Sequence, residues 1–521
     1  MRDFVLLVLF LLTVSFPAPP LSAQPSDARP VDLYNEPYRP QFHFTPARNW
    51  MNDPNGPIYY EGEYHLFYQY NPFGDVWGDM SWGHAVSPDL VHWKHLPVAL
   101  SEENGVMIFS GSTVVDWHNT SGFCRGSDGE AGSCLVAIYS GSSYKLQTQN
   151  LAYSNDKGRT WTKYAGNPVI DLHLAGFRDP KVFWHEGTHR WIMVTALGSQ
   201  HKLKLFGSTD LKHWAALSDF GPAGATGGAW ECPDLFPLPV DGDASQTKWV
   251  LSVNLNPGGV AGGSGNQYFV GSFDGTTFAS ENSPQQTLWA DYGPDFYAST
   301  SFSDLPKSDG RRIWLGWLSN WRYGAKVPTA PWRGVQSIPR ELKLRRFADG
   351  VRLVQEPVSE LRTLRQQRTR IENHSFEAAN GLLKSKGIGG EMLEIIAEIS
   401  PGDASEVGLR IREGGGEETL IGIDTKKLTL FVDRTHSGDV SFDEHFPSRD
   451  AGPIILAAGK SIRLHLFIDR SSVEVFGNDG ETVLSEAMFP KSSSDGIKLY
   501  SLDGRARVLK MDVWNLKSAY R

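Results

Sequence analysis

Three acidic residues, widely separated in this 521-residue chain, stand in short segments that suit a reactive site: Asp53, Asp179 and Glu231. Pro54 lacks a backbone donor and holds the segment before it extended, so we expect Asp53 at a strand entrance. Two carboxylates about 5 Å apart, on either side of a glycosidic bond, can cleave it with retention of configuration. One acts as nucleophile, and the other as acid and then base. The chemistry is available if the segments converge.

The two working carboxylates must differ in pKa. Asp53 has to stay ionised at the working pH, which hydrogen-bond donors such as Asn52 and Arg178 would favour. Glu231 has to hold its proton, and its position between a tryptophan and a cysteine predicts apolar, partly dry surroundings that raise its pKa. We therefore assign Asp53 as the candidate nucleophile and Glu231 as the candidate acid and base.

Asp179 lies between Arg178 and Pro180, and an adjacent Arg-Asp pair is usually a solvated surface pair. Inside a sugar pocket, a carboxylate that takes no part in proton transfer can accept hydrogen bonds from two sugar hydroxyls. Such bonds strengthen as the ring becomes oxocarbenium-like, so Asp179 is the candidate transition-state stabiliser. Arg178 could hold Asp179 in place or pair with Glu231, and the sequence leaves both roles open.

A repeated motif organises the first two thirds of the chain. Each copy has a strand that ends in serine, a turn centred on aspartate and an aromatic residue that begins the next strand. The four copies lie at residues 87–93, 154–161, 208–214 and 272–278. Further strand-like runs precede each copy, and four strands at this period are typical of a propeller blade. A fifth unit can be drawn from residues 296–303 and 313–321. We predict an all-β, five-bladed β-propeller, with a strand at 41–44 that closes the ring.

The openings of these units carry acidic residues. Asp53 opens the first unit, Asp179 the third, Glu231 and Asp234 the fourth, and Asp295 the fifth. The first strand of each propeller blade lines the central channel, so residues at equivalent starts come together although they lie far apart in sequence. The repeat therefore predicts that these carboxylates share one axial pocket.

The pattern changes after about residue 345. Residues 356–368 have helical spacing with a proline near the start, which indicates a linker helix. Short strands of alternating apolar and polar residues follow, separated by Gly and Asp turns, which is typical of an antiparallel β-sandwich. The expected strands are at residues 392–399, 407–411, 428–432, 462–468, 472–476, 497–502 and 508–514. We therefore divide the chain into a catalytic propeller domain (38–345), a linker with a short helix (346–370) and a C-terminal β-sandwich (371–521).

Residues 1–23 have the form of a secretory signal peptide. Arg2 precedes an apolar run at 4–16, and Leu21-Ser22-Ala23 makes a small-residue cleavage site before Gln24. The run is shorter than the roughly 20 residues that span a bilayer. We predict secretion, extracellular or periplasmic, with no membrane attachment after cleavage.

Charge and cysteine content narrow the possible partners. The formal net charge of −9, without a long basic run, argues against nucleic acid as a partner.

Cys124 and Cys134 flank a Gly/Ser-rich loop and could pair after export or remain two free thiols. If they pair, Cys232 stays reduced and buried. The sequence specifies no oligomeric partner.

Aromatic and amide side chains near the expected pocket are suited to sugar recognition. Core packing is the default for any one tryptophan or phenylalanine, but Trp77 lies in a Gly-rich turn of the kind found at the surface. The candidate substrate-binding residues are Trp50, Asn52, Gln69, Trp77, Phe109, Ser110, Arg178 and Trp332.

The chain resembles the family 32 glycoside hydrolases, the invertases, exo-inulinases and levanases that cleave β-fructofuranosides. The opening motif Trp-Met-Asn-Asp-Pro-Asn-Gly at 50–56 is similar to the first signature of that family. Further family motifs follow in the same order over residues 38–517, including Phe-Arg-Asp-Pro at 177–180, Trp-Glu-Cys-Pro-Asp at 230–234 and Asp-Arg-Ser-Ser-Val-Glu-Val-Phe-Gly at 469–477.

The resemblance implies roles for individual residues and an overall reaction. Asp53 would be the nucleophile, Asp179 the transition-state stabiliser and Glu231 the acid and base, with sugar contacts at Asn52, Gln69, Trp77, Ser110, Arg178 and Trp332. It implies a five-bladed propeller plus sandwich, no metal and no organic cofactor. The motifs look most like those of exo-acting levanases and inulinases, which release terminal fructose from β-2,1 or β-2,6 fructans and from sucrose.

Three other functions fit parts of the sequence. Residues 154–161 have the form of a sialidase Asp-box, but a sialidase needs a three-arginine clamp, and Arg178 is the one arginine that opens a unit. A non-catalytic fructan-binding protein should lack at least one of the three carboxylates. A fructosyltransferase would use the same residues as a hydrolase, so it stays an alternative.

Overall fold

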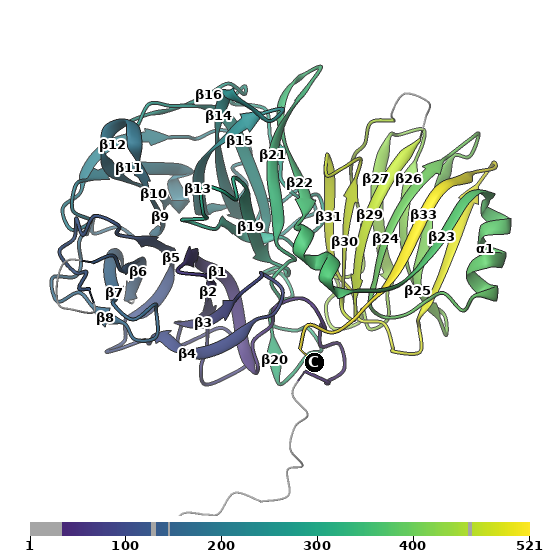
Figure 1. Cartoon of the computed structure of the whole chain (residues 1–521), viewed down its shortest axis with the longest axis horizontal. Coiled ribbons are helices and arrows are strands. Elements are labelled where there is room, and N and C mark those ends of the chain that lie inside the picture. The colour runs from purple at the N-terminus through teal and green to yellow at the C-terminus, as the bar shows by residue number, and fades with distance from the viewer. Residues whose placement is uncertain (1–33, 127–131, 144–145, 457–460, 521) are drawn as a thin grey trace, which may run out of the picture.

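The protein consists of two β-domains that lie side by side (Figure 1). The computed structural model describes residues 34–126, 132–143, 146–456 and 461–520, so the predicted signal peptide at 1–23 lies outside the described residues. No helix in these ranges is long and apolar enough to cross a membrane.

The N-terminal domain is built from successive groups of antiparallel strands. The first two groups are β1 (Asn49–Tyr60), β2 (Glu63–Tyr70), β3 (Ser81–Ser87) and β4 (Lys94–Leu100), then β5 (Met107–Val115), β6 (Leu135–Ser143), β7 (Leu146–Ser154) and β8 (Thr162–Lys163). The third is β9 (Phe177–His185), β10 (Arg190–Leu197), β11 (Lys202–Ser208) and β12 (Ala215–Phe220).

The last two groups share one sheet. They are β13 (Ala229–Val240), β14 (Asp243–Asn256), β15 (Gly265–Phe273), β16 (Phe278–Ser280) and β17 (Leu288–Trp289), then β18 (Tyr297–Ser301), β19 (Arg312–Trp317), β21 (Arg340–Phe347) and β22 (Gly350–Pro357). A single pairing of Val240 with Leu344 joins them. The short β20 (Trp332–Arg333) runs parallel to β1.

The first strands of the five groups form a closed ring. β1 contacts β5, β5 contacts β9, β9 contacts β13, β13 contacts β18, and β18 returns to β1. This is the arrangement of a β-propeller, in which the innermost strands line a central channel. Side chains near the start of each inner strand therefore meet at one end of the channel.

The predicted aspartate turns are confirmed. In the first copy, Asp89 accepts hydrogen bonds from the hydroxyl of Ser87 and from the backbone N–H groups of Val91 and His92. The third copy repeats this arrangement at Asp210. In the second copy Asp156 accepts from the hydroxyl of Ser154 and one backbone N–H, that of Thr160, and in the fourth Asp274 accepts two backbone N–H groups. An aspartate side chain that hydrogen-bonds nearby backbone N–H groups stabilises a turn. Each copy of the motif therefore forms the turn between the end of one strand and the start of the next.

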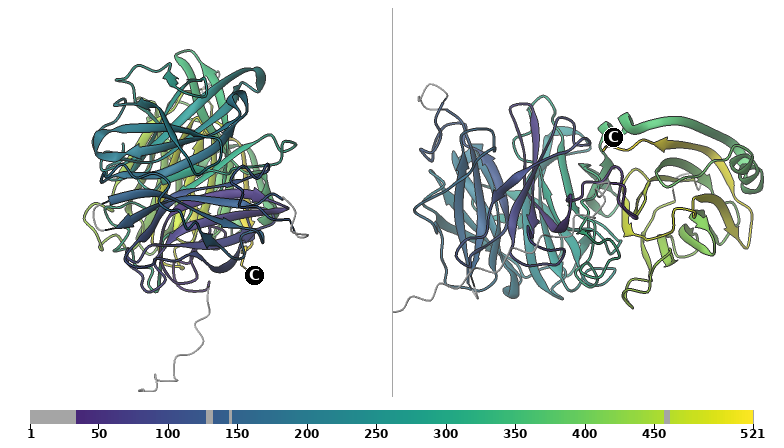
Figure 2. Two further views of the ribbon diagram at one scale, coloured as in Figure 1. Left: turned by 90° about the vertical axis from the view of Figure 1, so that its left-hand side faces the viewer. Right: turned by 90° about the horizontal axis from the view of Figure 1, so that it is seen from below.

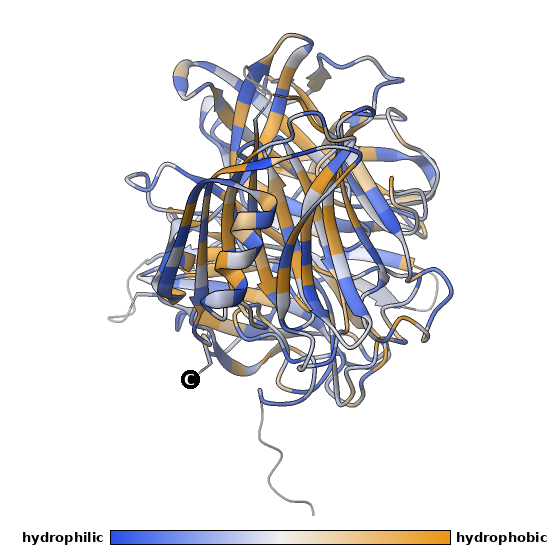
Figure 3. Cartoon of the chain, turned by 90° about the vertical axis from the view of Figure 1, so that its right-hand side faces the viewer, coloured by the Kyte–Doolittle hydropathy of each residue, from blue (hydrophilic) through white to orange (hydrophobic). Residues whose placement is uncertain are grey.

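The C-terminal domain is a sandwich of two antiparallel sheets (Figure 2). One sheet contains β23 (Arg365–Ser375), β24 (Leu393–Ser400), β29 (Ile462–Asp469), β30 (Ser472–Gly477), β31 (Thr482–Ala487) and β33 (Arg507–Leu516). The other contains β25 (Glu406–Gly414), β26 (Glu417–Asp424), β27 (Thr429–His436), β28 (Arg449–Pro453) and β32 (Gly496–Leu502). Apolar and polar residues alternate along these strands (Figure 3), as expected when one face of each sheet is buried.

The connection between the domains is shorter than predicted. β22 pairs with β21 and extends the propeller to Pro357, and β23 already belongs to the sandwich. Between them lies a 3-10 helix at Ser359–Leu364, so the longer linker helix at 356–368 is wrong. The helical spacing predicted too long a helix because the residues on either side of the 3-10 helix form backbone hydrogen bonds with neighbouring strands. An unpredicted helix, α1 (Phe376–Ser385), begins at Ser375, whose side chain caps it.

The predicted closing strand at 41–44 is also wrong. The backbone N–H groups of Gln41 and Phe42 donate to the carboxylate of Asp469 in the sandwich, at 2.9 and 3.1 Å, and not to a neighbouring strand.

Cys124 and Cys134 form a disulfide and Cys232 is free. The pairing that the sequence left open is therefore resolved.

A buried polar network joins the two domains. Arg340 of β21 pairs with Asp291 at 2.9 Å and with Glu474 of the sandwich. Arg434 of the sandwich pairs with Asp295 at 2.6 Å. Asp295 was predicted to face the axial pocket, and that prediction is wrong, because a buried arginine of the second domain draws its carboxylate outward.

His43 belongs to the same network and should make stability depend on pH. Burial opposes a charge on His43, but hydrogen bonds to Asp469 at 2.8 Å and Glu474 at 3.0 Å outweigh it and raise its pKa to about 9. Since the folded state raises this pKa above the unfolded value of about 6.5, the contribution is complete below pH 6.5 and is lost as pH rises through 9. Its size is on the order of 3 kcal/mol, at about 1.4 kcal/mol per pKa unit.

The measurement compares denaturant unfolding of wild type and His43→Gln from pH 6 to pH 10. Wild type should be the more stable protein at pH 6, and the difference in the free energy of unfolding should shrink steadily toward pH 9. A difference that does not change with pH would contradict the assignment of a charged His43.

Candidate functional site

Asp53 lies in β1 and is held by donors on both carboxylate oxygens. Ser110 Oγ donates to Oδ2 at 2.6 Å, and Asn52 Nδ2 donates to Oδ1 at 2.9 Å. Asn52 is oriented in turn by Trp50, whose Nε1 donates to Oδ1 of Asn52 at 2.7 Å. The thiol of Cys232 lies 3.5 Å from Oδ2 of Asp53. Asp53 is 9 % exposed, and these hydrogen bonds fix the orientation of its carboxylate.

Asp179 lies in β9 with φ at 63°, in the left-handed region that a non-glycine residue rarely adopts. Its backbone N–H donates to Ser140 Oγ at 2.8 Å, and the backbone N–H of Cys232 donates to its Oδ2 at 3.0 Å. Strained backbone of this kind concentrates at functional sites, where surrounding contacts hold it in place. Cys232 thus bonds Asp179 through its backbone and contacts Asp53 through its thiol, which brings the two aspartates together.

Glu231 lies in β13 and has polar partners on both oxygens. Arg178 Nε donates to Oε1 at 3.1 Å and its Nη2 pairs with the same oxygen, while the Tyr297 hydroxyl donates to Oε2. Both roles that the sequence left open to Arg178 are observed, since it hydrogen-bonds Glu231 and its Nε also lies 3.7 Å from Oδ2 of Asp179.

The predicted apolar surroundings of Glu231 are wrong. Trp230 is fully buried and packs with Leu235 and Phe269 between neighbouring groups of strands. Successive side chains of a strand point to opposite faces, so Trp230 faces the core while Glu231 faces the channel.

The carboxylates influence one another electrostatically. Burial raises the pKa of Asp53, although the hydrogen bonds from Ser110 and Asn52 work in the opposite direction. Burial also raises the pKa of Asp179 to about 7; Arg178 opposes this increase, and the charges of Glu231 and Asp53 add to it. Burial and the charges of its neighbours therefore bring the titration of Asp179 close to neutral pH.

Five inner strands present one residue each at the same level of the channel. A small void beneath the carboxylates is lined by Pro54, Gly111, Pro180, Pro233 and Ala298, one from each first strand. The residues that precede them are Asp53, Ser110, Asp179, Cys232 and Tyr297. Convergence of the unit openings is thus observed, with a serine, a cysteine and a tyrosine completing the set.

Cys232 and Tyr297 are the site residues that sequence reasoning missed. Aligning the units on Pro54, Pro180 and Pro233 would have placed Cys232 opposite Asp53 and Asp179, which was the available signal. The fifth unit has no proline at this point, so nothing comparable marked Tyr297.

Aromatic rings gather beside the carboxylates. Trp50 is fully buried, with Trp317 and Trp321 each 5.8 Å away between ring centroids. Trp77 is 43 % exposed and meets Phe109 edge to face at 6.0 Å. Exposed rings at the rim of a polar pocket offer faces on which a sugar can pack.

Two predicted contact residues have other partners. Gln69 is buried, and its Nε2 donates to the backbone oxygen of Ile108 at 3.0 Å. Trp332 is 1 % exposed in an apolar cluster that includes Phe446 and Phe489 of the sandwich, with Arg39 4.2 Å from its ring. The structure therefore brings Trp332 to the domain interface and not beside the carboxylates.

Asp234 and the histidines lie away from the carboxylate cluster. Asp234 sits deeper in the channel and pairs with Lys181 at 3.3 Å. His65 and His84 bond each other at 3.1 Å. Within the described ranges, no group of three or more His, Cys, Asp or Glu side chains is arranged so that it could hold a metal ion.

Comparisons with known proteins agree on one family. Residues 43–357 match the model of the glycosyl hydrolases family 32 N-terminal domain, and residues 360–515 match that of its C-terminal domain. The chain is 51% identical to the levanase of Bacillus subtilis, over 98% of this chain and 74% of the levanase. It is 43% identical to the extracellular exo-inulinase of Aspergillus niger, over 94% and 96% of the two chains. The crystal structure of the exo-inulinase from Aspergillus awamori superposes with a TM-score of 0.86 at 41% identity, over 94% of this chain and 100% of that one.

The coupling between Glu231 and Asp179 can be measured directly. Because the charge of Glu231 raises the pKa of Asp179, Glu231→Gln should lower that pKa from about 7. Carboxyl carbon NMR of aspartate-labelled protein would follow the titration. Glu281→Gln, which changes an exposed glutamate paired with Lys248, should leave it where it is. An unchanged Asp179 titration in Glu231→Gln would show that the two groups do not interact.

Proposed function

Because the chain belongs to glycosyl hydrolase family 32, we propose that it is a secreted, retaining exo-β-fructosidase. It would release terminal β-D-fructofuranosyl residues from inulin- and levan-type fructans and from sucrose. The observation that carries the proposal is the meeting of Asp53, Asp179 and Glu231 around Cys232 at one end of the propeller channel. The names of its relatives, levanase and exo-inulinase, support this substrate class.

The contacts of the two working carboxylates support a covalent mechanism. Glu231 gives its proton to the oxygen of the leaving group as the Asp53 carboxylate attacks the anomeric carbon, so the glycosidic bond breaks and a fructosyl ester forms on Asp53. Glu231 then takes a proton from water, which attacks the same carbon and releases Asp53. Ser110 and Asn52 would hold Asp53 in line during both steps.

Asp179 and Arg178 have supporting roles in this mechanism. Asp179 takes no part in proton transfer and would accept hydrogen bonds from fructose hydroxyls, which strengthen as positive charge develops on the ring. Arg178 and Tyr297 fix the orientation of the Glu231 carboxylate through its two oxygens.

The closed floor of the pocket supports removal of a terminal residue. Beneath the carboxylates, the void lined by Ser110, Asp179, Lys181 and Thr300 has a volume of only 20 Å³, space for about one water molecule. A fructosyl unit that enters would stop at this floor, so a chain presents its end and not its middle.

Three observations support secretion. Residues 1–23 have the form of a signal peptide. The Cys124–Cys134 disulfide is typical of an oxidising compartment. The similar exo-inulinase of Aspergillus niger is extracellular.

The first test measures sugar release from sucrose, inulin and levan by wild type and by Glu231→Ala. Fructose should be the single product from either polymer, identified by chromatography. Loss of general acid and base catalysis should reduce kcat roughly 100- to 10,000-fold in Glu231→Ala, whereas Glu281→Ala should keep wild-type rates. Longer oligosaccharide products would indicate an endo-enzyme or a fructosyltransferase. A wild type that turns over none of the three would leave a fructan-binding protein as the function.

A second test uses the pH profile of kcat/KM, which reports the ionisation of the free enzyme. Asp53 must be ionised to attack, so activity falls as pH drops through its pKa. Ser110→Ala removes a hydrogen bond that lowers this pKa, so the acidic limb should move to higher pH. A hydrogen bond to a charged group is typically worth about 2 kcal/mol, which corresponds to about 1.5 pH units. Ser245→Ala, an exposed control, should not move the limb, and an unmoved limb in Ser110→Ala would refute the role of Ser110.

A further inference from the structure

A large cavity opens at the end of the propeller channel opposite the carboxylates. It has a volume of about 750 Å³ and is lined by the later residues of the same inner strands. β9 carries Asp179 near its start and His185 at its end, six residues further on. At about 3.3 Å per residue, the two ends of the channel are roughly 20 Å apart.

A layer of paired polar groups separates this cavity from the reactive pocket. Lys181 Nζ donates to Thr300 Oγ1 at 3.1 Å and to the backbone oxygen of Ser301 at 2.5 Å, and it pairs with Asp234 at 3.3 Å. The void above this layer is the 20 Å³ space already described. A sugar chain therefore cannot pass through the channel, and the cavity is a separate site.

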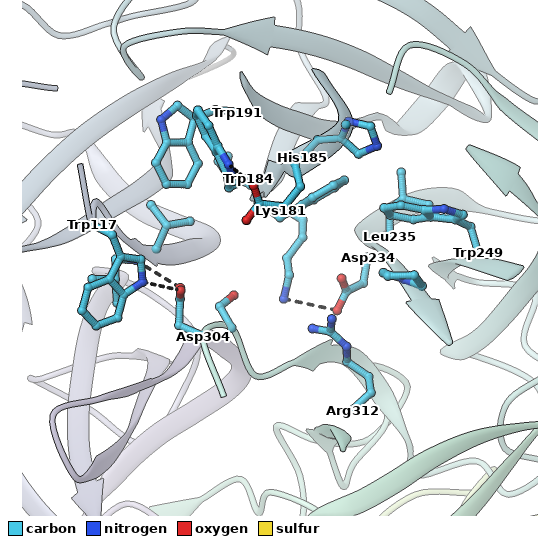
Figure 4. A pocket seen from close by; sticks show the side chains of 18 of the residues that line it. Trp117, Lys181, Trp184, His185, Trp191, Asp234, Leu235, Trp249, Asp304 and Arg312 are labelled. Atoms are coloured by element: carbon cyan, nitrogen blue, oxygen red, sulfur yellow. Dashed lines mark hydrogen bonds and ion pairs between the residues drawn. The ribbon is translucent and has the colours of Figure 1, made fainter. Parts of the chain in front are cut away.

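Tryptophan rings form much of the cavity wall (Figure 4). Trp117 is 54 % exposed, and its Nε1 donates to Asp304 at 3.0 Å, which fixes the ring. Trp184 and Trp249 line other parts of the cavity and are partly buried. Fixed aromatic faces beside polar groups are the surfaces on which sugar rings pack.

The charges in the cavity balance. Its lining includes three basic residues, Lys181, Lys307 and Arg312, and three acidic residues, Glu186, Asp234 and Asp304. Neither a cation nor an anion is favoured by such a set, whereas a neutral molecule with many hydroxyls can both donate to the acids and accept from the bases. The volume also lies within the roughly 300–1,000 Å³ of ordinary ligand sites.

We propose that this cavity is a second, non-catalytic carbohydrate site that holds a short run of fructosyl units. The inference rests on the proposed function for the identity of the sugar. The acids here are not arranged for cleavage, since Asp234 pairs with Lys181 and Asp304 accepts from Trp117. The cavity therefore retains the polymer without cutting it and raises the local concentration of chain ends near the reactive pocket.

The kinetic test substitutes Trp117, which is exposed enough to be replaced without unfolding the domain. Trp117→Ala should raise KM for long inulin or levan roughly fivefold, the effect of losing one aromatic contact, with kcat unchanged. Sucrose is too small to bridge two sites, so its kcat/KM should stay at the wild-type value. Trp117→Phe should restore most of the polymer KM, and Leu428→Ala, which removes an exposed apolar side chain from the sandwich, should change nothing.

A binding measurement separates this inference from the proposed function. Calorimetric titration of Glu231→Ala with a fructan oligosaccharide of about five units should give two bound molecules per chain, and addition of Trp117→Ala should leave one. Fructan hydrolysis by wild type together with a single bound molecule in both variants would overturn the second site alone. Equal loss of sucrose and polymer activity in Trp117→Ala would also overturn it. Failure of wild type to hydrolyse any fructan would overturn the proposed function instead.

Discussion

The reactive pocket has to stabilise three closely spaced acidic groups that repel one another, and its other residues supply the compensating interactions. Asp53, Asp179 and Glu231 share a largely buried space, which raises the cost of placing negative charge there. Arg178 supplies one positive charge, and hydroxyl, amide and backbone donors supply the remaining compensation. No single strand could hold such a set, so the positions must come from a rigid ring of strands.

The ring provides this rigidity through equivalent positions on its inner strands. Each first strand enters the channel at the same level, so the side chains before Pro54, Pro180 and Pro233 meet although they lie far apart in the sequence. The backbone of Asp179 is held at positive φ by contacts from neighbouring strands. The scaffold thus stabilises conformations that an isolated segment would not keep.

The second domain acts on the first through buried charges. Arg340 and Arg434 draw Asp291, Asp295 and Glu474 into a network at the interface, and removing one partner would leave an unpaired charge in a dry setting. The last group of propeller strands is therefore supported by the sandwich as well as by its neighbours in the ring. At the same time the layer around Lys181 divides the channel, so its two ends can serve different purposes.

The sequence alone determined the features that depend on neighbouring residues. The serine–aspartate turns, the alternating strands and the three carboxylates at unit openings could be read from local turn chemistry and a period of two. The tertiary structure decided the partners of each group: Arg178 lies between Glu231 and Asp179, Asp295 pairs with Arg434, and Trp332 packs in the domain interface. Those choices depend on contacts between residues far apart in the chain, where burial and charge pairing outweigh any local preference.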